Sequence, residues 1–111
     1  MIKIEAVIRP EKLKDVKEAL SQIGINAMTI YNVKGRGEQA GLEFSARTGV
    51  FRIDELPKVK IEVVIEDPDE HKVIDAILVS ARTGEMGDGK IFVTPVHRAI
   101  KIRTGDEWTY S

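Results

Sequence analysis

Alternation of apolar and polar residues predicts three β-strands, at residues 2–9, 26–33 and 58–66. Each segment has the two-residue period of a strand that buries one face and exposes the other. A fourth strand is predicted at residues 91–96, after a glycine-rich segment. All four strands are short enough to belong to a single small sheet.

Two segments between these strands carry apolar residues at helical spacing. The first helix is expected to begin at Pro10 and to end at Gly24, because glycine readily adopts the left-handed conformation that stops a helix. The second helix is expected to start with Asp67 as its cap and Pro68 in its first turn. Gly84 is expected to end this second helix.

The predicted order is therefore β-α-β-β-α-β, a recurrent two-layer α+β arrangement. Both helices would cover one face of an antiparallel sheet. We call the other, uncovered side of the sheet the open face. Val7 and Val64 are expected on the open face, where an apolar strip would favour association with another chain.

Composition narrows the classes of protein that this chain can represent. A length of 111 residues with 42% hydrophobic residues fits one compact domain. Basic and acidic residues nearly balance, at 17 and 18, so no field of the whole chain attracts nucleic acid or anionic lipid. The chain has no cysteine, no signal-peptide pattern at its start and no apolar run of bilayer length, so we expect a cytoplasmic protein without membrane insertion.

Two segments concentrate glycine and charge. Residues 34–56 are too long and irregular for an ordinary turn, which indicates a functional loop. Residues 82–90 contain three glycines and end in Lys90, so their backbone N–H groups could cradle phosphates. Neither segment completes a named phosphate motif, and flexible turns beside a solvated lysine remain an alternative interpretation.

A third basic element is formed by Lys101 and Arg103. In an extended segment, two residues that are two positions apart place their side chains on the same side. This pair could therefore bind an anion, although a solvated strand edge is an equally good interpretation from the local sequence.

Four motifs together resemble the PII signal-transduction protein family over residues 1–105. They are Lys34-Gly-x-Gly-x-Gln39, Asp54-x-Leu-Pro-Lys58-Val-Lys-Ile-Glu62, Ala81-Arg-Thr-Gly-x-x-Gly-Asp-Gly-Lys-Ile-Phe-Val93 and Ile102-Arg-Thr-Gly105. The third is long enough to be highly specific. The resemblance implies a single domain over residues 1–111 with a ferredoxin-like fold, assembled as a homotrimer. It also implies a nucleotide sensor that regulates other proteins and catalyses nothing.

The resemblance further implies that ATP or ADP binds in clefts between subunits, with 2-oxoglutarate beside Mg-ATP. We call residues 82–90 the phosphate loop, and the long loop at about residues 36–56 the T-loop, the family's name for the segment that contacts targets. Lys101 and Arg103 would reach the phosphates from the neighbouring subunit. The nucleotide-binding residues implied in this way are Val7, Thr29, Gly35, Gly37, Glu38, Gln39, Glu62, Val64, Thr83, Gly87, Asp88, Gly89, Lys90, Lys101 and Arg103. Those that match positions around adenine and ribose are Val7, Thr29, Gly35, Glu62, Val64 and Thr83.

The same resemblance assigns the effector and the metal. Gly37, Gln39, Gly41 and Lys58 match positions that hold 2-oxoglutarate, and the Lys58 ammonium would pair with a carboxylate of the effector. Gln39 would also hold Mg, which prefers oxygen ligands.

The T-loop departs from the commoner family pattern. Glu38 stands where relatives usually have an Arg that meets the terminal phosphate, and Lys101 also replaces a common Arg. Phe51 occupies the position of a Tyr that is uridylylated in many relatives, and it has no hydroxyl to modify. Arg47 matches a residue that plugs an ammonium transporter in some relatives, although a lone exposed arginine is more often simply solvated. The family resemblance implies as partners an ammonium transporter or an enzyme or regulator of nitrogen metabolism, bound by a T-loop that we expect to be mobile when free.

Three other interpretations remain. An enzyme is disfavoured because His71 and His97 lie far apart in the sequence without metal-ligating neighbours, although slow ATP hydrolysis stays open. Nucleic-acid binding is disfavoured because only Tyr31 and Phe92 are aromatic residues of the strands and no basic residues cluster beside them. The nearest alternative is a divergent member of the family that senses another adenine nucleotide or small anion.

Overall fold

The computed structural model describes residues 1–36, 42–46, 49–53 and 55–108, and for 42–46 and 49–53 it describes the backbone alone. Short 3₁₀ turns precede both helices. In chain order the elements are β1 (Ile2–Ile8), a 3₁₀ turn (Pro10–Lys12), α1 (Leu13–Gln22), β2 (Thr29–Gly35), β3 (Leu42–Ala46), β4 (Gly49–Ile53), β5 (Leu56–Ile65), a second 3₁₀ turn (Asp67–Asp69), α2 (Glu70–Ala81) and β6 (Lys90–Pro95).

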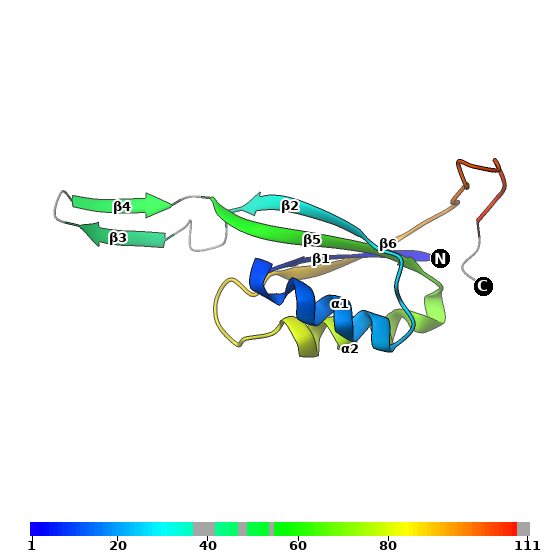
Figure 1. The fold of residues 1–111 in the computed structure, drawn as a ribbon, viewed down its shortest axis with the longest axis horizontal. Coiled ribbons are helices and arrows are strands. Elements are labelled where there is room, and N and C mark those ends of the chain that lie inside the picture. Colours follow the sequence, from blue (N-terminus) through cyan, green and yellow to red (C-terminus); the bar gives the residue numbers. More distant parts are fainter. Residues whose placement is uncertain (37–41, 47–48, 54, 109–111) are drawn as a thin grey trace.

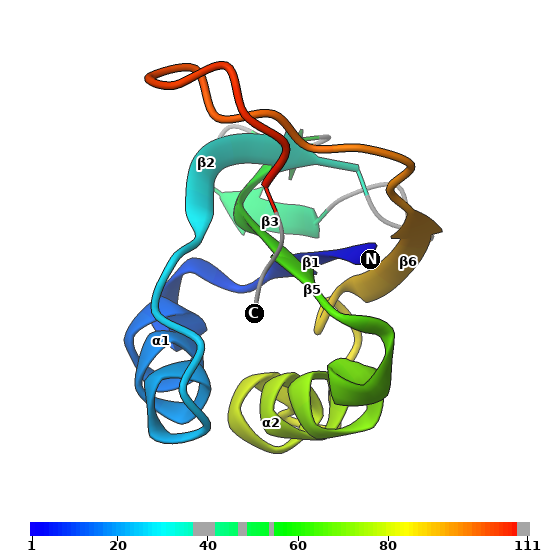
Figure 2. The same cartoon turned by 90° about the vertical axis from the view of Figure 1, so that its right-hand side faces the viewer.

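Four of the strands form one antiparallel sheet in the order β2-β5-β1-β6. Both helices lie on the same side of this sheet, as Figure 2 shows end-on. The structure therefore confirms the predicted α+β, ferredoxin-like arrangement, in which the two central strands are β1 and β5.

The core lies between the sheet and the two helices. On β1 the inward residues Ile4, Ala6 and Ile8 are buried while their neighbours are only partly covered, which is the predicted alternation. Removing each large apolar side chain from water stabilises the fold by about 1.5–3 kcal/mol. The other buried apolar residues are Val16, Leu20, Ile25, Val59, Ile61, Val63, Ile65, Val73, Ile77 and Ala81.

The second helix begins and ends differently from the prediction. No side chain caps it: the carboxylate of Asp67 instead lies 2.8 Å from the N-terminal ammonium of Met1, a full positive charge that competes with neutral N–H groups of the helix. The helix ends at Ala81, three residues before Gly84, because Arg82 already has extended backbone dihedrals. The first helix ends as predicted near Gly24, whose φ is 86°.

The long loop contains a β-hairpin that the sequence analysis missed. Strands β3 and β4 pair antiparallel from Leu42 opposite Ile53 to Ala46 opposite Gly49. The hairpin projects beyond the ends of β2 and β5, away from the helices (Figure 1). Flanking glycine and charged residues hid the strand-forming residues of the segment, such as Val50 and Phe51. The prediction of an irregular loop was therefore wrong for these ten residues.

The open face is largely charged, so the expected apolar strip is not continuous. Val7 lies opposite Lys60 on one side and Lys90 on the other, and Val64 lies opposite Lys3. Between the two valines, Lys3 Nζ lies 3.0 Å from a carboxylate oxygen of Glu5. Phe92, which lies opposite Glu5 and is exposed, adds an apolar group to this face, so the open face carries charged and apolar side chains side by side.

Candidate functional site

The phosphate loop connects α2 to β6 and lies against the end of β1. The loop glycines Gly84, Gly87 and Gly89 have φ values of 89°, 96° and 97°, which disfavour residues with a side chain. At Gly89 the space is also closed, because an added Cβ would lie 1.7 Å from the carbonyl oxygen of Val7. The loop backbone can therefore approach β1 only if this position is glycine.

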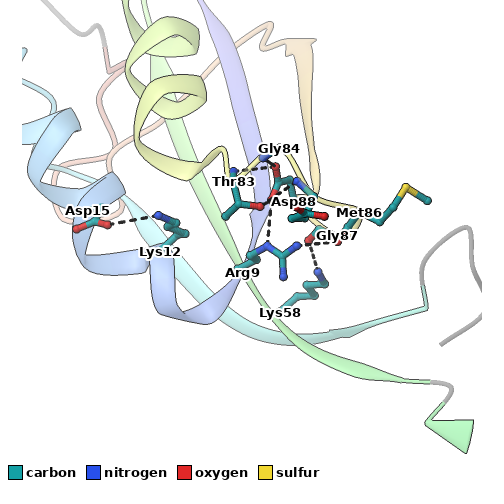
Figure 3. Close-up of polar contacts among 10 residues, drawn as sticks. Arg9, Lys12, Asp15, Lys58, Thr83, Gly84, Met86, Gly87 and Asp88 are labelled. Carbon is teal, nitrogen blue, oxygen red and sulfur yellow. Dashed lines mark hydrogen bonds and ion pairs between the residues drawn. The ribbon is translucent and has the colours of Figure 1, made fainter. Parts of the chain in front are cut away.

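Asp88 organises the phosphate loop through four hydrogen bonds. Its carboxylate accepts the backbone N–H of Thr83 at 2.9 Å, the Thr83 hydroxyl at 2.5 Å and the backbone N–H of Gly84 at 2.9 Å. The fourth donor is Arg9 Nε, at 3.0 Å (Figure 3). These donors, the Thr83 hydroxyl foremost, hold the pKa of Asp88 well below its usual range. Asp88 is thus an ionised acceptor inside the loop.

Two cations, one directly after β1 and one on β5, bind carbonyl groups of the same loop. Arg9 Nη2 donates to the Met86 oxygen at 2.6 Å, and Lys58 Nζ donates to the Gly87 oxygen at 2.6 Å. Figure 3 shows both side chains reaching the loop from the strand side. Lys58 also lies beside the end of β2, since its Cγ would be 3.2 Å from a Cβ on Gly35. Lys58 therefore connects the phosphate loop with the base of the T-loop.

Arg9 is the functional candidate that sequence reasoning missed. It follows β1 directly, and the local pattern marks it only as the polar residue before Pro10. Its partner Asp88 lies 79 residues away in the chain. Neither hydrophobic periodicity nor motif spacing predicts a contact between residues so far apart in the sequence, so it is apparent only in the folded structure.

The predicted adenine and ribose positions lie along the sheet. Thr29 pairs with Glu62 across β2 and β5, and Glu62 accepts the Tyr31 hydroxyl at 3.2 Å. This hydrogen bond raises the pKa of Tyr31. On the neighbouring strand, the hydrogen bond between Lys3 and Glu5 raises the pKa of Lys3 and lowers that of Glu5. Glu5 is therefore paired with Lys3 on β1, and Glu62 is hydrogen-bonded to Tyr31.

Some predicted residues are brought together and others are not. Val7 pairs with Lys90, and Gly89 packs on Val7, so these three meet at one corner of the sheet. Lys101 and Arg103 instead follow the end of β6 opposite to the phosphate loop (Figure 1). Within one chain they therefore do not lie beside that loop.

The segment that carries Lys101 and Arg103 is not extended as predicted. It closes into a turn in which the Gly105 N–H donates to the Lys101 oxygen at 2.8 Å and the Lys101 N–H donates to the Asp106 oxygen at 2.9 Å. A φ of 74° at Gly105 permits this turn. The expectation that the two cations share one side of a strand is therefore wrong.

Several predicted residues lie outside the described part of the chain, namely Gly37, Glu38, Gln39, Gly41 and Arg47. Phe51 lies in β4, opposite Phe44 in the backbone register. Over the described ranges, no three His, Cys, Asp or Glu side chains gather as a metal site would require. Within the same ranges, no helix is long and apolar enough to cross a membrane.

Comparison with known proteins decides the family. The family model described as "Nitrogen regulatory protein P-II" matches residues 1–106. This chain belongs to that P-II family. The match covers both strands of the central pair, both helices and the phosphate loop, and it confirms the family that the sequence motifs indicate.

Curated relatives of this P-II protein come from both archaea and bacteria. The chain is 54% identical over 107 residues to nitrogen regulatory protein P-II of Haemophilus influenzae, covering 96% of each chain. It is 51% identical over 106 residues to nitrogen regulatory protein P-II 1 of Methanothermobacter thermautotrophicus, covering 96% of this chain and 92% of the relative. Identity to nitrogen regulatory protein P-II 1 of Escherichia coli K12 is 50% over 107 residues, again covering 96% of each chain. The family is thus one of nitrogen regulatory signal proteins.

Proposed function

We propose that this P-II family member senses ATP or ADP, together with 2-oxoglutarate, and regulates a target protein through its T-loop without being an enzyme. The observation that carries the proposal is the phosphate loop, which is already ordered by Asp88, Arg9 and Lys58. Its glycines allow close backbone approach, and Lys90 adds a positive charge at its end.

The tight contact of Gly89 with Val7 supports nucleotide binding at this corner. Because the loop backbone is pressed onto β1, a nucleotide held by the loop can extend along the open face past Val7 toward Glu62 and Thr29. This path joins the phosphate-binding residues to the positions expected around adenine and ribose. Lys3 and Lys60 of the open face are already paired with Glu5 and Glu62. An anion is therefore expected to bind more favourably at the phosphate loop than on the open face.

The position of Lys101 and Arg103 supports the proposed homotrimer with nucleotide between subunits. Both lie past the far end of β6, so a ligand on the phosphate loop can meet them only if a second copy of the chain supplies them. The ligand would then bind only the assembled native state and stabilise it by mass action. We expect light scattering to give a trimer mass and the melting temperature to rise with ADP or ATP.

Lys58 supports 2-oxoglutarate as the effector. Its ammonium lies between the phosphate loop and the base of the T-loop, where it can pair with a carboxylate next to the nucleotide phosphates. Gln39 would supply an oxygen ligand to Mg, and Gly37 and Gly41 would supply backbone donors to the effector. Such an arrangement couples effector binding to Mg-ATP in both directions.

The T-loop is proposed to contact an ammonium transporter or an enzyme or regulator of nitrogen metabolism. The β3–β4 hairpin stands clear of the body of the subunit and offers unpaired strand edges to a partner (Figure 1). Arg47 and Phe51 belong to this segment, and Phe51 excludes uridylylation at its position. Removal of residues 42–50 should abolish partner capture and leave ADP affinity unchanged.

Calorimetric titration tests the proposal directly. ATP, ADP and AMP are titrated separately into the protein, and 2-oxoglutarate is then titrated with and without Mg-ATP. We expect ATP and ADP to bind and 2-oxoglutarate to require Mg-ATP. If AMP alone bound, or if 2-oxoglutarate bound equally well without Mg-ATP, the protein would be a divergent sensor of another ligand. Steady release of phosphate from ATP would instead support an enzyme.

A further inference from the structure

Arg9 connects two points of the phosphate loop that no other described side chain joins. Its Nε donates to Asp88 at 3.0 Å and its Nη2 donates to the Met86 carbonyl at 2.6 Å. The planar guanidinium fixes the relative position of both donors, so one side chain sets the distance between a side chain and a backbone group of the loop. Arg9 is itself held by its place at the end of β1, just before Pro10.

The contact between Arg9 and Asp88 also has an electrostatic effect. The carboxylate belongs to a loop that is proposed to hold phosphates, and an unpaired anion there would repel them. Arg9 neutralises the carboxylate and completes its set of four donors, with Thr83 and Gly84 supplying the others. The side chains of Arg9 and Asp88 are only 23% and 25% exposed, so solvent screens their pairing less than it would screen a pair on the open surface.

We infer that Arg9 is a positioning residue for the phosphate loop, which it shapes through Asp88 and Met86 before nucleotide arrives. The inference rests on the proposed nucleotide binding and assigns Asp88 a supporting role inside the loop. Lys58 braces the adjacent Gly87 carbonyl but is also the expected partner of 2-oxoglutarate. Arg9 is then the cation that maintains the loop when Lys58 turns to the effector.

The test compares ADP affinity and loop exchange in five variants. Arg9→Gln, Asp88→Asn and their double variant remove the contact, while Lys12→Gln is the matched control. Lys12 lies three residues from Arg9 and pairs with Asp15 at 3.9 Å, away from the loop (Figure 3). Calorimetry gives the ADP affinity, and amide hydrogen exchange over residues 83–89 is measured without nucleotide.

We expect Arg9→Gln to weaken ADP binding about 10-fold or more, as loss of a charged hydrogen bond does. The double variant should bind no worse than the weaker single variant, because both changes break one unit. Exchange over residues 83–89 should speed up in Arg9→Gln and stay unchanged in Lys12→Gln. Arg9→Lys, the fifth variant, keeps the charge but loses the fixed pair of donors, and it should recover part of the affinity.

Two results would overturn the inference. Wild-type affinity in Arg9→Gln would show that the contact does not matter for binding. Additive losses in the double variant with unchanged loop exchange would show that Arg9 touches the phosphate directly. If the wild-type protein bound neither ADP nor ATP, the proposed function would fail instead, and the exchange measured without ligand would still report whether Arg9 orders the loop.

Discussion

Gly89 lies directly against the carbonyl oxygen of Val7, which leaves no room for a side chain: a Cβ at this position would be 1.7 Å from that oxygen. The contact sets how closely the phosphate loop approaches β1. Gly89 is therefore required for two reasons, its left-handed backbone and the lack of space for a Cβ, whereas only the first applies to Gly84.

The first prediction uses this difference between the two glycines. Gly89→Ala should push the loop off β1, lower the free energy of unfolding and abolish measurable ADP binding, because a backbone oxygen cannot move aside cheaply. Gly84→Ala is the control: its φ is 89° but an added Cβ meets nothing within 4 Å, so it should cost only about 1–2 kcal/mol of backbone strain. Denaturant unfolding and calorimetry measure both quantities. Equal effects of the two substitutions would contradict the importance of the Val7 contact.

The second prediction concerns pH. The donors around Asp88 lower its pKa in the folded state, so its contribution to stability is present above the ordinary carboxyl range, near about 4. That contribution is lost as the pH falls from there toward the lowered folded value. Asp88→Asn should therefore be clearly less stable than wild type at pH 7, and the gap should narrow below about pH 4.

Unfolding by urea at a series of pH values checks this expectation. Asp75→Asn provides the control, because Asp75 is an exposed carboxylate of α2. A difference between wild type and Asp88→Asn that stays constant from pH 7 to pH 3 would show that the carboxylate charge does not stabilise the loop.

The third prediction concerns Lys58, which bonds the Gly87 carbonyl at 2.6 Å. Lys58→Ala should lower 2-oxoglutarate affinity in the presence of Mg-ATP by about 10-fold or more, since a charged partner of a carboxylate is lost. Lys60→Ala, two residues further along β5 and paired with Glu62 at 3.8 Å, should have little effect. Calorimetric titration of 2-oxoglutarate measures both. Equal losses in the two variants would point to a general effect of charge.

The fourth prediction concerns Glu38, which replaces the Arg expected beside the terminal phosphate. Glu38→Arg should raise the ratio of ATP to ADP affinity by about fivefold, corresponding to about 1 kcal/mol for a charge interaction near the surface. ATP should gain more than ADP, because the triphosphate carries the terminal group. Glu55→Arg serves as the control, since Glu55 is exposed just before β5. An unchanged ratio in Glu38→Arg would mean that this position does not sense the terminal phosphate.

The sequence by itself determined the layers of this protein. Strands and helices are recognised by apolar residues that recur every two and every 3.6 residues, a pattern that depends only on nearby positions in the chain. The inward residues of β1, such as Ile4 and Ile8, were predictable in this way and are buried. The glycine-rich segment at residues 82–90 was also recognisable, because Gly84, Gly87, Gly89 and Lys90 lie close together in the chain.

The tertiary structure decided how distant segments complete the site. Arg9 meets Asp88 across 79 residues, and Lys58 meets Gly87 from a different strand. Asp67 binds the N-terminal ammonium in place of capping a helix, because folding brings a stronger partner to it. Such contacts depend on the three-dimensional path of the chain, whereas periodicity reports only which face of an element is buried.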